Sequence, residues 1–338
     1  MTRLTYTTDE LLASVDYDAP HTAGGQRLHG GLLADGTYVP PRTKFRVPAI
    51  AAWEAALRER GGEPFGASSD LLDGIRVPTA EQQRVLLRNG LGEVFWNGLT
   101  ITGKIEARGR FLSDLPVPDL QTAIVEDISE MAIGHLDRGL LDAHGIDEGG
   151  DPSNGIGGHD AMWFVLRDLA LGANAYPDVE PEANIGRDDA GKRFMPEIDE
   201  GVERFFAFLA NLLIIEFRAE LGFADTQENL LTPDLFVANR AEAETASEMV
   251  ERIRTDELIH VRSLNLYLGE LRSITLRTVD GGTVSGAALI DRFWDGMVRW
   301  ATVEQPALVA ERQRTGLGAL ISRHDDAERV QYEFDRAA

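Results

Sequence analysis

Two long stretches with the residue pattern of amphipathic helices constrain the fold of this chain more than any other feature. They cover residues 198–221 and 241–271, and apolar residues recur in each at helical spacing. Each apolar face nevertheless contains a carboxylate, Glu216 in the first stretch and Glu257 in the second. Burying an unpaired carboxylate is costly. We therefore expect a positive partner inside the protein, and a bound cation is the simplest candidate.

The remaining sequence predicts more helices and an irregular beginning. Residues 1–78 are expected to form an irregular N-terminal arm packed on a main body of residues 79–338. Within the arm we expect a short hairpin around Asp35-Gly36 and a helix over 48–60. The main body is expected to contain, besides the two stretches above, a helical stretch from Thr79 to about 113 that breaks at its glycines, helices over 119–143 and 159–171, a hairpin turn over 279–284, and closing helices over 286–303 and 306–320. This order predicts an all-α fold.

The composition argues against several classes of protein. The chain of 338 residues has 33 Lys and Arg against 56 Asp and Glu, a net charge of −23, which disfavours binding to nucleic acid or to an anionic membrane surface. Its most apolar stretch, 205–217, is shorter than the roughly 20 residues that a membrane span needs. The first ten residues lack the apolar core of a secretory signal, so we expect a cytoplasmic location. The chain has no cysteine, so any metal must be held by oxygen and imidazole.

The clearest candidate for metal binding is the segment Glu257-Leu258-Ile259-His260. Side chains three residues apart are neighbours on a helix, so Glu257 and His260 can reach one metal ion. Glu216, on the preceding long helical stretch, is a second acid on an apolar face.

The first half of the chain contains a weaker version of this pattern. Glu106 shares a stripe with apolar residues of its helical stretch, and His135 lies on the apolar face of the expected helix 119–143. Glu130 projects away from that face in a regular helix, but a π-bulge between the two residues would bring it onto the side of His135. Asp127, at the edge of the stripe, is the competing acid.

These residues resemble the ligand pattern of the ferritin-like superfamily of di-iron carboxylate oxidases and oxygenases. In that family a Glu on one helix is followed by Glu-x-x-His on the next, and the pair occurs twice. The resemblance covers roughly residues 80–270 and implies a ferritin-like four-helix bundle with extra helices. It also implies a site for two iron ions, or iron with manganese, whose ligands are Glu106, Glu130, His135, Glu216, Glu257 and His260.

The function implied by the resemblance is that of a non-haem oxidase or oxygenase. Such a protein uses dioxygen and an electron donor to oxidise a small organic substrate, and it is compatible with a homodimer. His159, at the start of the expected helix 159–171, is a candidate for the extra histidine that some of these oxygenases recruit; the alternative is an ordinary residue at a helix start.

Three other interpretations remain open. One is a metal-storage or ferroxidase protein. Another is a metal-free helical interaction protein, in which arginines neutralise the buried acids and the histidines are ordinary core residues. The third is a metal-dependent hydrolase, although the chain lacks the His-Glu-x-x-His and Gly-x-Ser-x-Gly patterns of peptidases and serine hydrolases.

Overall fold

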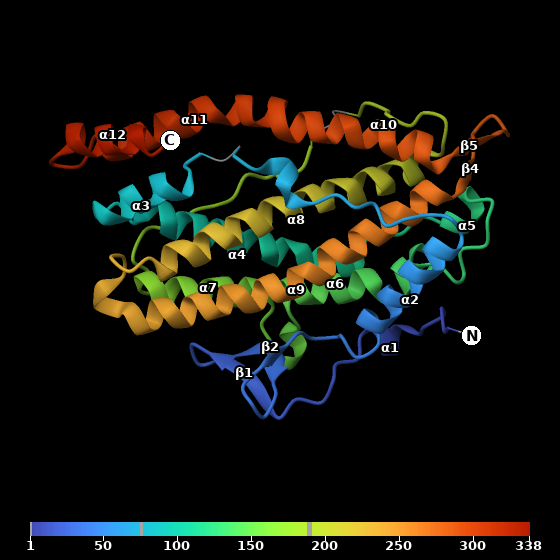
Figure 1. The fold of residues 1–338 in the computed structure, drawn as a ribbon, viewed down its shortest axis with the longest axis horizontal. Helices are drawn as coiled ribbons and strands as arrows, with labels where there is room; N and C mark the ends of the chain where they lie inside the picture. Colours follow the sequence, from blue (N-terminus) through green and yellow to red (C-terminus); the bar gives the residue numbers. More distant parts are fainter. Residues whose placement is uncertain (1, 75–76, 188–190) are drawn as a thin grey trace.

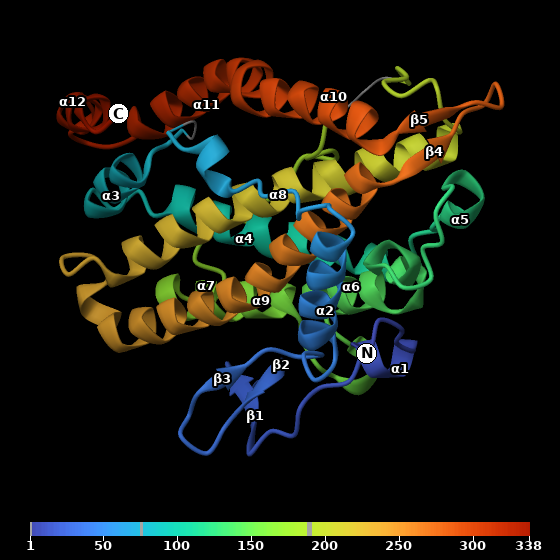
Figure 2. The same ribbon diagram turned by 45° about the vertical axis from the view of Figure 1, so that its right-hand side comes forward.

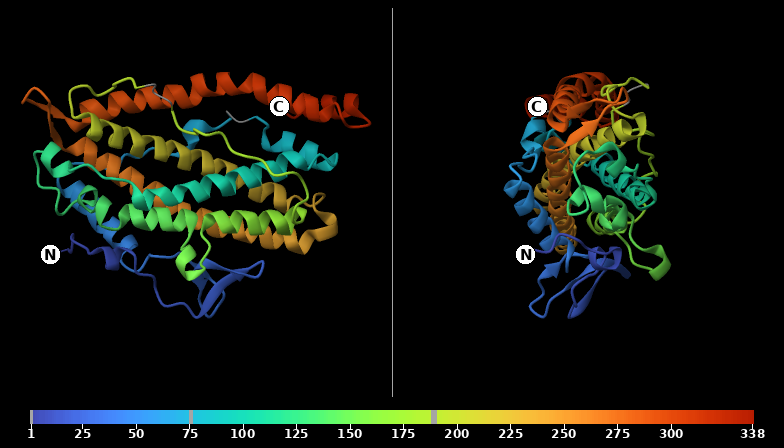
Figure 3. Two further views of the ribbon diagram at one scale, coloured as in Figure 1. Left: turned by 180° about the vertical axis from the view of Figure 1, so that it is seen from behind. Right: turned by 90° about the vertical axis from the view of Figure 1, so that its right-hand side faces the viewer.

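The protein is built mainly from helices that lie side by side. The computed structural model describes residues 2–74, 77–187 and 191–338, and most of them are helical, which confirms the expected all-α class. Four helical rods form the body (Figure 1). They are α4 (Glu93–Gly109), α6 (Leu140–Gly149) together with α7 (His159–Leu171), α8 (Glu200–Leu231) and α9 (Arg240–Ser273). The helices α6 and α7 lie end to end as one interrupted rod (Figures 1 and 3).

The main contacts between the rods run from one rod to the next and do not close into a ring. α8 packs against α9, α9 against α7, and α7 against α4. Fully buried apolar side chains from these rods, such as Leu213 of α8 and Ile253 of α9, form the core between them. A cavity lined by both α4 and α8 occupies the remaining side of the body. The cavity is therefore bounded by rods on two sides.

The two longest rods follow the predicted periodicity. α9 begins and ends within two residues of the expected stretch 241–271. α8 starts at the expected place, where Asp199 accepts hydrogen bonds from the N–H groups of Gly201 and Val202, but it continues ten residues beyond the expected end at 221. It continues because Phe223 extends the apolar stripe and packs on Trp163, with ring centroids 4.7 Å apart.

The predicted stretch from Thr79 is also confirmed, including its break. Thr79 caps α3 (Ala80–Arg88) and forms a reciprocal pair of hydrogen bonds with Gln82. The chain then turns at Gly90, whose φ of 70° favours glycine, before α4 begins. A 3-10 turn, η2 (Arg110–Asp114), ends the stretch.

The helix expected over 119–143 is wrong. The range contains instead α5 (Leu120–Ala123), a 3-10 segment, η3 (Ala132–Arg138), and the first turn of α6, which begins at Leu140. The chain between α5 and η3 is extended where the N–H of Val125 donates to the carbonyl of Thr275. Glu270 of α9 then accepts a hydrogen bond of 2.9 Å from the N–H of Ile133. These contacts with distant segments replace the bonds of a continuous helix, and the apolar periodicity here comes from a buried loop.

The buried carboxyl group of Glu270 predicts a pH effect on stability. Burial raises its pKa from 4.5 to about 7, so folding favours the protonated form. That contribution is fully present below the unfolded pKa and is lost as the pH rises through about 7. Glu270→Gln keeps an oxygen for Ile133 but cannot ionise. Between pH 5 and pH 8 its unfolding free energy should therefore fall by roughly 1–3 kcal/mol less than that of the wild type. Urea unfolding at both pH values measures this, and an equal fall in the variant and the wild type would contradict it. The exposed Glu63→Gln variant is the control.

The N-terminal arm is more regular than expected. It contains α1 (Thr8–Leu11), the antiparallel strands β1 (Ala19–Ala23), β2 (Gln26–Leu32) and β3 (Tyr38–Val39), α2 (Arg46–Glu59) and the 3-10 turn η1 (Ser69–Leu72). The predicted hairpin is confirmed by the pairing of β2 with β3, and the predicted helix by α2. The sheet lies along one edge of the body, below α7 and α9 in the view of Figure 2. The N–H of His29 in β2 donates a 2.8 Å hydrogen bond to the carbonyl of Gly157, which connects the sheet to the segment between α6 and α7.

The C-terminal part covers the opposite edge of the body. After the hairpin of β4 (Thr275–Arg277) and β5 (Thr283–Ser285), α10 (Gly286–Arg299) runs through a π-helical turn, η6 (Trp300–Glu304), into α11 (Gln305–Ile321). The two predicted closing helices thus form one helical path (Figures 1 and 3). A further helix, α12 (Ala327–Arg336), packs on α3. Short 3-10 turns at Pro152–Asn154 (η4) and Val237–Asn239 (η5) complete the fold. Over the described parts of the chain, no helix combines the length and apolar character needed to cross a membrane.

Candidate metal centre

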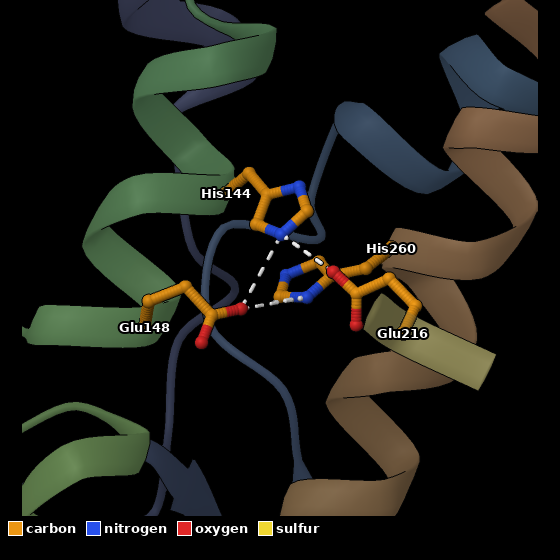
Figure 4. A group of neighbouring side chains, drawn as sticks. All are labelled: His144, Glu148, Glu216 and His260. Atoms are coloured by element: carbon orange, nitrogen blue, oxygen red, sulfur yellow. Dashed lines mark ion pairs between the residues drawn. The ribbon is translucent and has the colours of Figure 1, made fainter. Parts of the chain in front are cut away.

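Carboxylates and imidazoles from all four rods meet in the middle of the body, and all of these side chains are buried. They are Glu106 of α4, His144 and Glu148 of α6, His159 of α7, Glu216 of α8, and Glu257 and His260 of α9. We refer to these residues as the seven-residue cluster. Figure 4 shows four of them, with Glu148 and Glu216 directed towards the rings of His144 and His260.

Helical spacing and one sharp turn explain why these residues meet. His144 and Glu148 are four residues apart on α6, and Glu257 and His260 are three apart on α9, so each pair lies on one helix face. His159 reaches the cluster because the chain turns back between α6 and α7. At Gly158 a Cβ atom would lie 2.3 Å from the nitrogen of Gly150, so only glycine allows this close approach.

The cluster consists of two overlapping groups that could each hold a metal ion. Within each group, one potential ligand atom per residue lies within 4.8 Å of the others. The first group is His144, Glu148, Glu216 and His260, and the second is Glu106, Glu148, His159 and Glu257.

Two glutamates connect the groups through their separate oxygens. Oε1 of Glu257 lies 3.1 Å from Nδ1 of His159, and its Oε2 lies 2.8 Å from Nδ1 of His260. Oε1 of Glu148 lies 3.2 Å from Nδ1 of His260, and its Oε2 lies 3.6 Å from Nδ1 of His159. Glu148 therefore belongs to both groups, and Glu257 of the second group also has an oxygen beside His260 of the first. Carboxylates placed in this way could bridge two ions.

The remaining contacts complete each group with its own glutamate. Oε1 of Glu216 lies 3.0 Å from Nε2 of His144. Oε2 of Glu106 lies 3.8 Å from Nδ1 of His159. Both imidazole nitrogens are buried, and neither forms a hydrogen bond of normal geometry within the described residues. Nitrogens without such a bond, surrounded by carboxylate oxygens, fit a shared cation.

Two aspartates behind the histidines determine which ring nitrogen faces the cluster. Oδ2 of Asp147 lies 3.1 Å from Nε2 of His260, and Oδ2 of Asp256 lies 3.3 Å from Nε2 of His159. A proton on each Nε2 would be donated to the aspartate, which leaves Nδ1 available as a ligand atom. Such carboxylate–histidine pairs orient metal ligands in known metal sites.

The N-terminal arm supports both aspartates. Tyr38 donates a hydrogen bond of 2.9 Å to Asp256, and Nε2 of His29 lies 2.9 Å from the same oxygen. Arg42 and Arg46 form ion pairs with Asp147. The arm therefore contributes to the centre through the residues behind the ligands.

Asp256 gives a prediction for this supporting layer. Asp256→Asn keeps the shape of the side chain but removes the charge that holds the proton on His159. We expect the metal affinity to fall about 10- to 100-fold while the helical content is preserved. Competition with a chromophoric chelator measures the affinity, and circular dichroism measures the fold. Asp168→Asn, at an aspartate of α7 that pairs with Arg167, is the control and should bind metal like the wild type. Equal affinities in both variants would contradict the role of Asp256.

The electrostatics of the cluster favour a cation. Burial raises the pKa of Glu106 well above its usual range, and repulsion from Glu148 adds to the shift. Burial also raises the pKa of Glu216 to about 8. Burial disfavours the charge on His159, but Glu257 and Asp256 outweigh it and raise its pKa. The cluster thus holds protons that a divalent ion would displace on binding.

Arginine does not take the place of that cation. Across the described residues, the four glutamates have ion-pair contacts with histidines only, and Arg42 and Arg46 contact Asp147 instead. The alternative in which arginines neutralise the buried acids therefore does not describe this cluster.

The structure brings together some of the residues expected from the sequence and separates others. Glu106, Glu216, Glu257 and His260 lie in the cluster, and so does the further candidate His159. The clear additions are His144 and Glu148, which lie between the expected helices 119–143 and 159–171 and were not candidates from the sequence. Their His-x-x-x-Glu spacing is the signal that would have identified them.

The expected first-half pair lies outside the cluster and is corrected. Glu130 is exposed. His135 is buried against Trp53, with ring centroids 4.9 Å apart, and Nδ1 lies 2.8 Å from the carbonyl of Met131. The alternative acid, Asp127, is exposed and accepts a hydrogen bond from the N–H of Ser129. The physical reason is that no continuous helix forms over 119–143, so no helix carries these residues to the other members of the cluster.

A large cavity borders the cluster. Its volume is about 1520 Å³, and Glu106, His144, Glu148 and Glu216 are among the residues that line it. Apolar side chains of α4 and α8 form much of the wall, and α11 contributes part of it. The cluster thus borders a space that is much larger than a dioxygen molecule.

The fold and the site define a helical protein with buried groups of carboxylates and histidines that could hold metal ions. Comparisons with protein-family models, with curated proteins and with solved structures found no match to the chain. Its function is therefore inferred from the residues of the site itself.

Proposed function

We propose that this protein is a ferritin-like oxidase or oxygenase with two iron ions, or iron with manganese, that oxidises a small organic substrate with dioxygen. The observation that carries the proposal is the pair Glu148 and Glu257, each with one oxygen beside a histidine of each of the two ligand groups. A single-ion site has no need of two such bridging carboxylates. Oxygen and imidazole ligands suit iron and manganese.

The origin of the ligands supports the ferritin-like interpretation. Two rods, α4 and α8, each contribute one glutamate, and α9 contributes Glu257-x-x-His260, as the superfamily pattern requires. The fourth rod departs from the pattern. It contributes His144 and Glu148 from α6 and, beyond the break, His159 from α7. The cluster therefore contains three histidines, His144, His159 and His260, where the superfamily pattern has two. The proposal includes all three as ligands.

The residues of the chain would perform three tasks in this reaction. Bound iron would supply the activation of dioxygen, with electrons from an external donor. The seven-residue cluster would hold the two ions, and Asp147 and Asp256 would keep His260 and His159 in the correct orientation and protonation state. The cavity beside Glu106 and Glu216 would hold the substrate, which favours an oxygenase over a storage protein.

Metal loading and oxygen uptake test the proposal. The metal-free protein is loaded with ferrous iron under anaerobic conditions, excess iron is removed, and bound iron is counted. We expect about two ions per chain in the wild type and a clear loss in Glu216→Ala and His260→Ala. Glu220→Ala, one helical turn after Glu216 and outside the cluster, is the control. Dioxygen uptake is then followed with a chemical reductant present.

Each result points to one interpretation. Continued dioxygen uptake beyond that needed to oxidise the bound iron supports the proposed oxidase or oxygenase. Stoichiometric iron without further uptake would indicate storage instead. A folded protein that binds no iron or manganese would contradict the proposal.

A further inference from the structure

The cavity beside the cluster contains a cation that its surroundings leave without a carboxylate. Arg218 of α8 lines the cavity and is half-buried, and within the described residues no carboxylate lies within ion-pair distance of it. Its hydrogen bonds are long, 3.4 Å to the carbonyl of Ile185 and 3.5 Å to Oε1 of Gln305. The guanidinium also lies over the ring of Trp300, 4.8 Å from its centroid. An arginine with such weak contacts and no carboxylate partner suits an external anion.

The acids along the same cavity wall do not compete for Arg218. Apart from the glutamates of the cluster, the acids that line the cavity pair with other cations. These pairs are Glu180 with Lys104, Glu182 with Arg312, Glu200 with Arg204, and Glu203 with Arg193. These pairs leave the positive charge of Arg218 available. Of the other cations that line the cavity, Arg108 donates to the backbone carbonyls of Pro181 and Glu182, and Lys192 lies over the ring of Phe194.

The position of Arg218 on α8 sets the shape of the expected ligand. Residues of α8 that line the cavity recur at helical spacing, and Glu216 and Arg218 lie on opposite edges of that stripe, since two residues turn the helix by about 200°. The surface between these edges is mostly apolar and includes Leu212, Ile215 and Ala219. A molecule that spans the stripe covers about 10 Å, the width of a helix with its side chains.

The opposite wall leaves room for such a molecule. Gly98 of α4 lines the cavity, and a Cβ atom built there would meet no other atom within 4 Å. The space beside α4 is therefore open at this point. A larger side chain at position 98 would project into the cavity without a clash with its wall.

We propose that the cavity binds an extended apolar molecule with an anionic end group, such as a carboxylate, which pairs with Arg218 while the apolar body lies across α8 towards Glu216 and His144. This inference names the substrate class of the proposed oxygenase and in that respect rests on the proposed function. The binding itself requires no metal, so it is testable in the metal-free protein.

Calorimetric titration of the metal-free protein with decanoate, decan-1-ol and decylamine tests the inference. The three probes share one apolar chain and differ in the charge of the end group. We expect decanoate to bind at least tenfold more tightly than the alcohol and the amine. Arg218→Met should weaken decanoate at least tenfold and leave the alcohol unchanged. The chain has five tryptophans, and Trp300 lies beside Arg218, so the tryptophan fluorescence should change with decanoate in the wild type and change less in Trp300→Phe.

Two further variants separate a binding defect from a folding defect. Gly98→Leu narrows the cavity on the side of α4 while it replaces a helix-interior glycine, so it should weaken the binding of all three probes without a loss of thermal stability. Arg329→Gln, at an exposed arginine of α12 that pairs with Glu333 and does not line the cavity, should bind decanoate like the wild type.

Several results would overturn the inference. These are equal affinities for the acid and the alcohol, no effect of Arg218→Met, normal binding in Gly98→Leu, or no binding of decanoate. Failure here and failure of the proposed function are distinct. Normal iron loading without decanoate binding overturns the substrate class alone, and decanoate binding without iron loading overturns the metal function alone.

Discussion

Replacing Glu148 with alanine is expected to reduce the iron content from about two ions per chain to well below one, and to abolish dioxygen uptake with it. Glu148 lies in both ligand groups, so its loss removes an anionic ligand from each ion at once. The other glutamate of this kind, Glu257, cannot compensate, because both of its oxygens already face histidines of the two groups. Iron analysis after anaerobic loading measures the effect.

Two companion variants make this prediction specific. Glu148→Gln keeps the volume of the side chain, so no cavity forms and the fold should be preserved. Its one amide oxygen cannot replace the two carboxylate oxygens, so iron should still be lost. Glu130→Ala changes the exposed glutamate that the sequence pattern favoured, and it should load like the wild type. Normal loading in Glu148→Ala, or a loss confined to Glu130→Ala, would refute the assignment of the bridging residue.

Replacing Gly158 with alanine is expected to disrupt both the fold and the metal centre. The added Cβ would lie 2.3 Å from the nitrogen of Gly150, 2.6 Å from the carbonyl oxygen of Glu148 and 2.7 Å from that of Asp147. All three are backbone atoms, so the clash is relieved only by moving the end of α6 away from the start of α7. We expect the unfolding free energy to fall by about 3 kcal/mol or more, and the iron content to fall with it.

A matched glycine separates this steric effect from the general effect of adding a methyl group. Gly98→Ala adds the same group to a helix that faces open space, and it should raise the stability by about 0.5–1 kcal/mol and leave the iron content unchanged. Thermal and urea unfolding of both variants, each with and without iron, provide the comparison. An unaltered melting temperature in Gly158→Ala would show that the turn tolerates a side chain.

The parts of the fold that sequence reasoning predicted are those with regular periodicity. The stretch that became α9 carries an apolar stripe over many turns, so its bounds and the inward position of Glu257 followed from spacing alone, and the structure confirms the burial of both Glu216 and Glu257. The hairpin at Asp35-Gly36 followed from local turn chemistry. In these places local preference and tertiary packing agree.

The part that failed is the region where distant contacts decide the conformation. Ile128 and Met131 are buried, but in a loop that is held by contacts with Thr275 and Glu270. A periodicity test reads such a buried loop as a helix face, because it registers only which residues are apolar. Because of this error the helix was expected to end at 143, whereas α6 runs from Leu140 to Gly149. The pair His144 and Glu148 was therefore not recognised.

The contacts of the N-terminal arm have a consequence for the order in which the protein matures. Tyr38 meets Asp256 across 218 positions of the chain, and Arg42 meets Asp147 across 105. During synthesis the earliest segment must wait for α9 to emerge before its aspartate partner exists, and contacts of such long range form slowly. The contacts that support the metal centre would then form only after most of the chain has emerged from the ribosome, and metal would be bound after that.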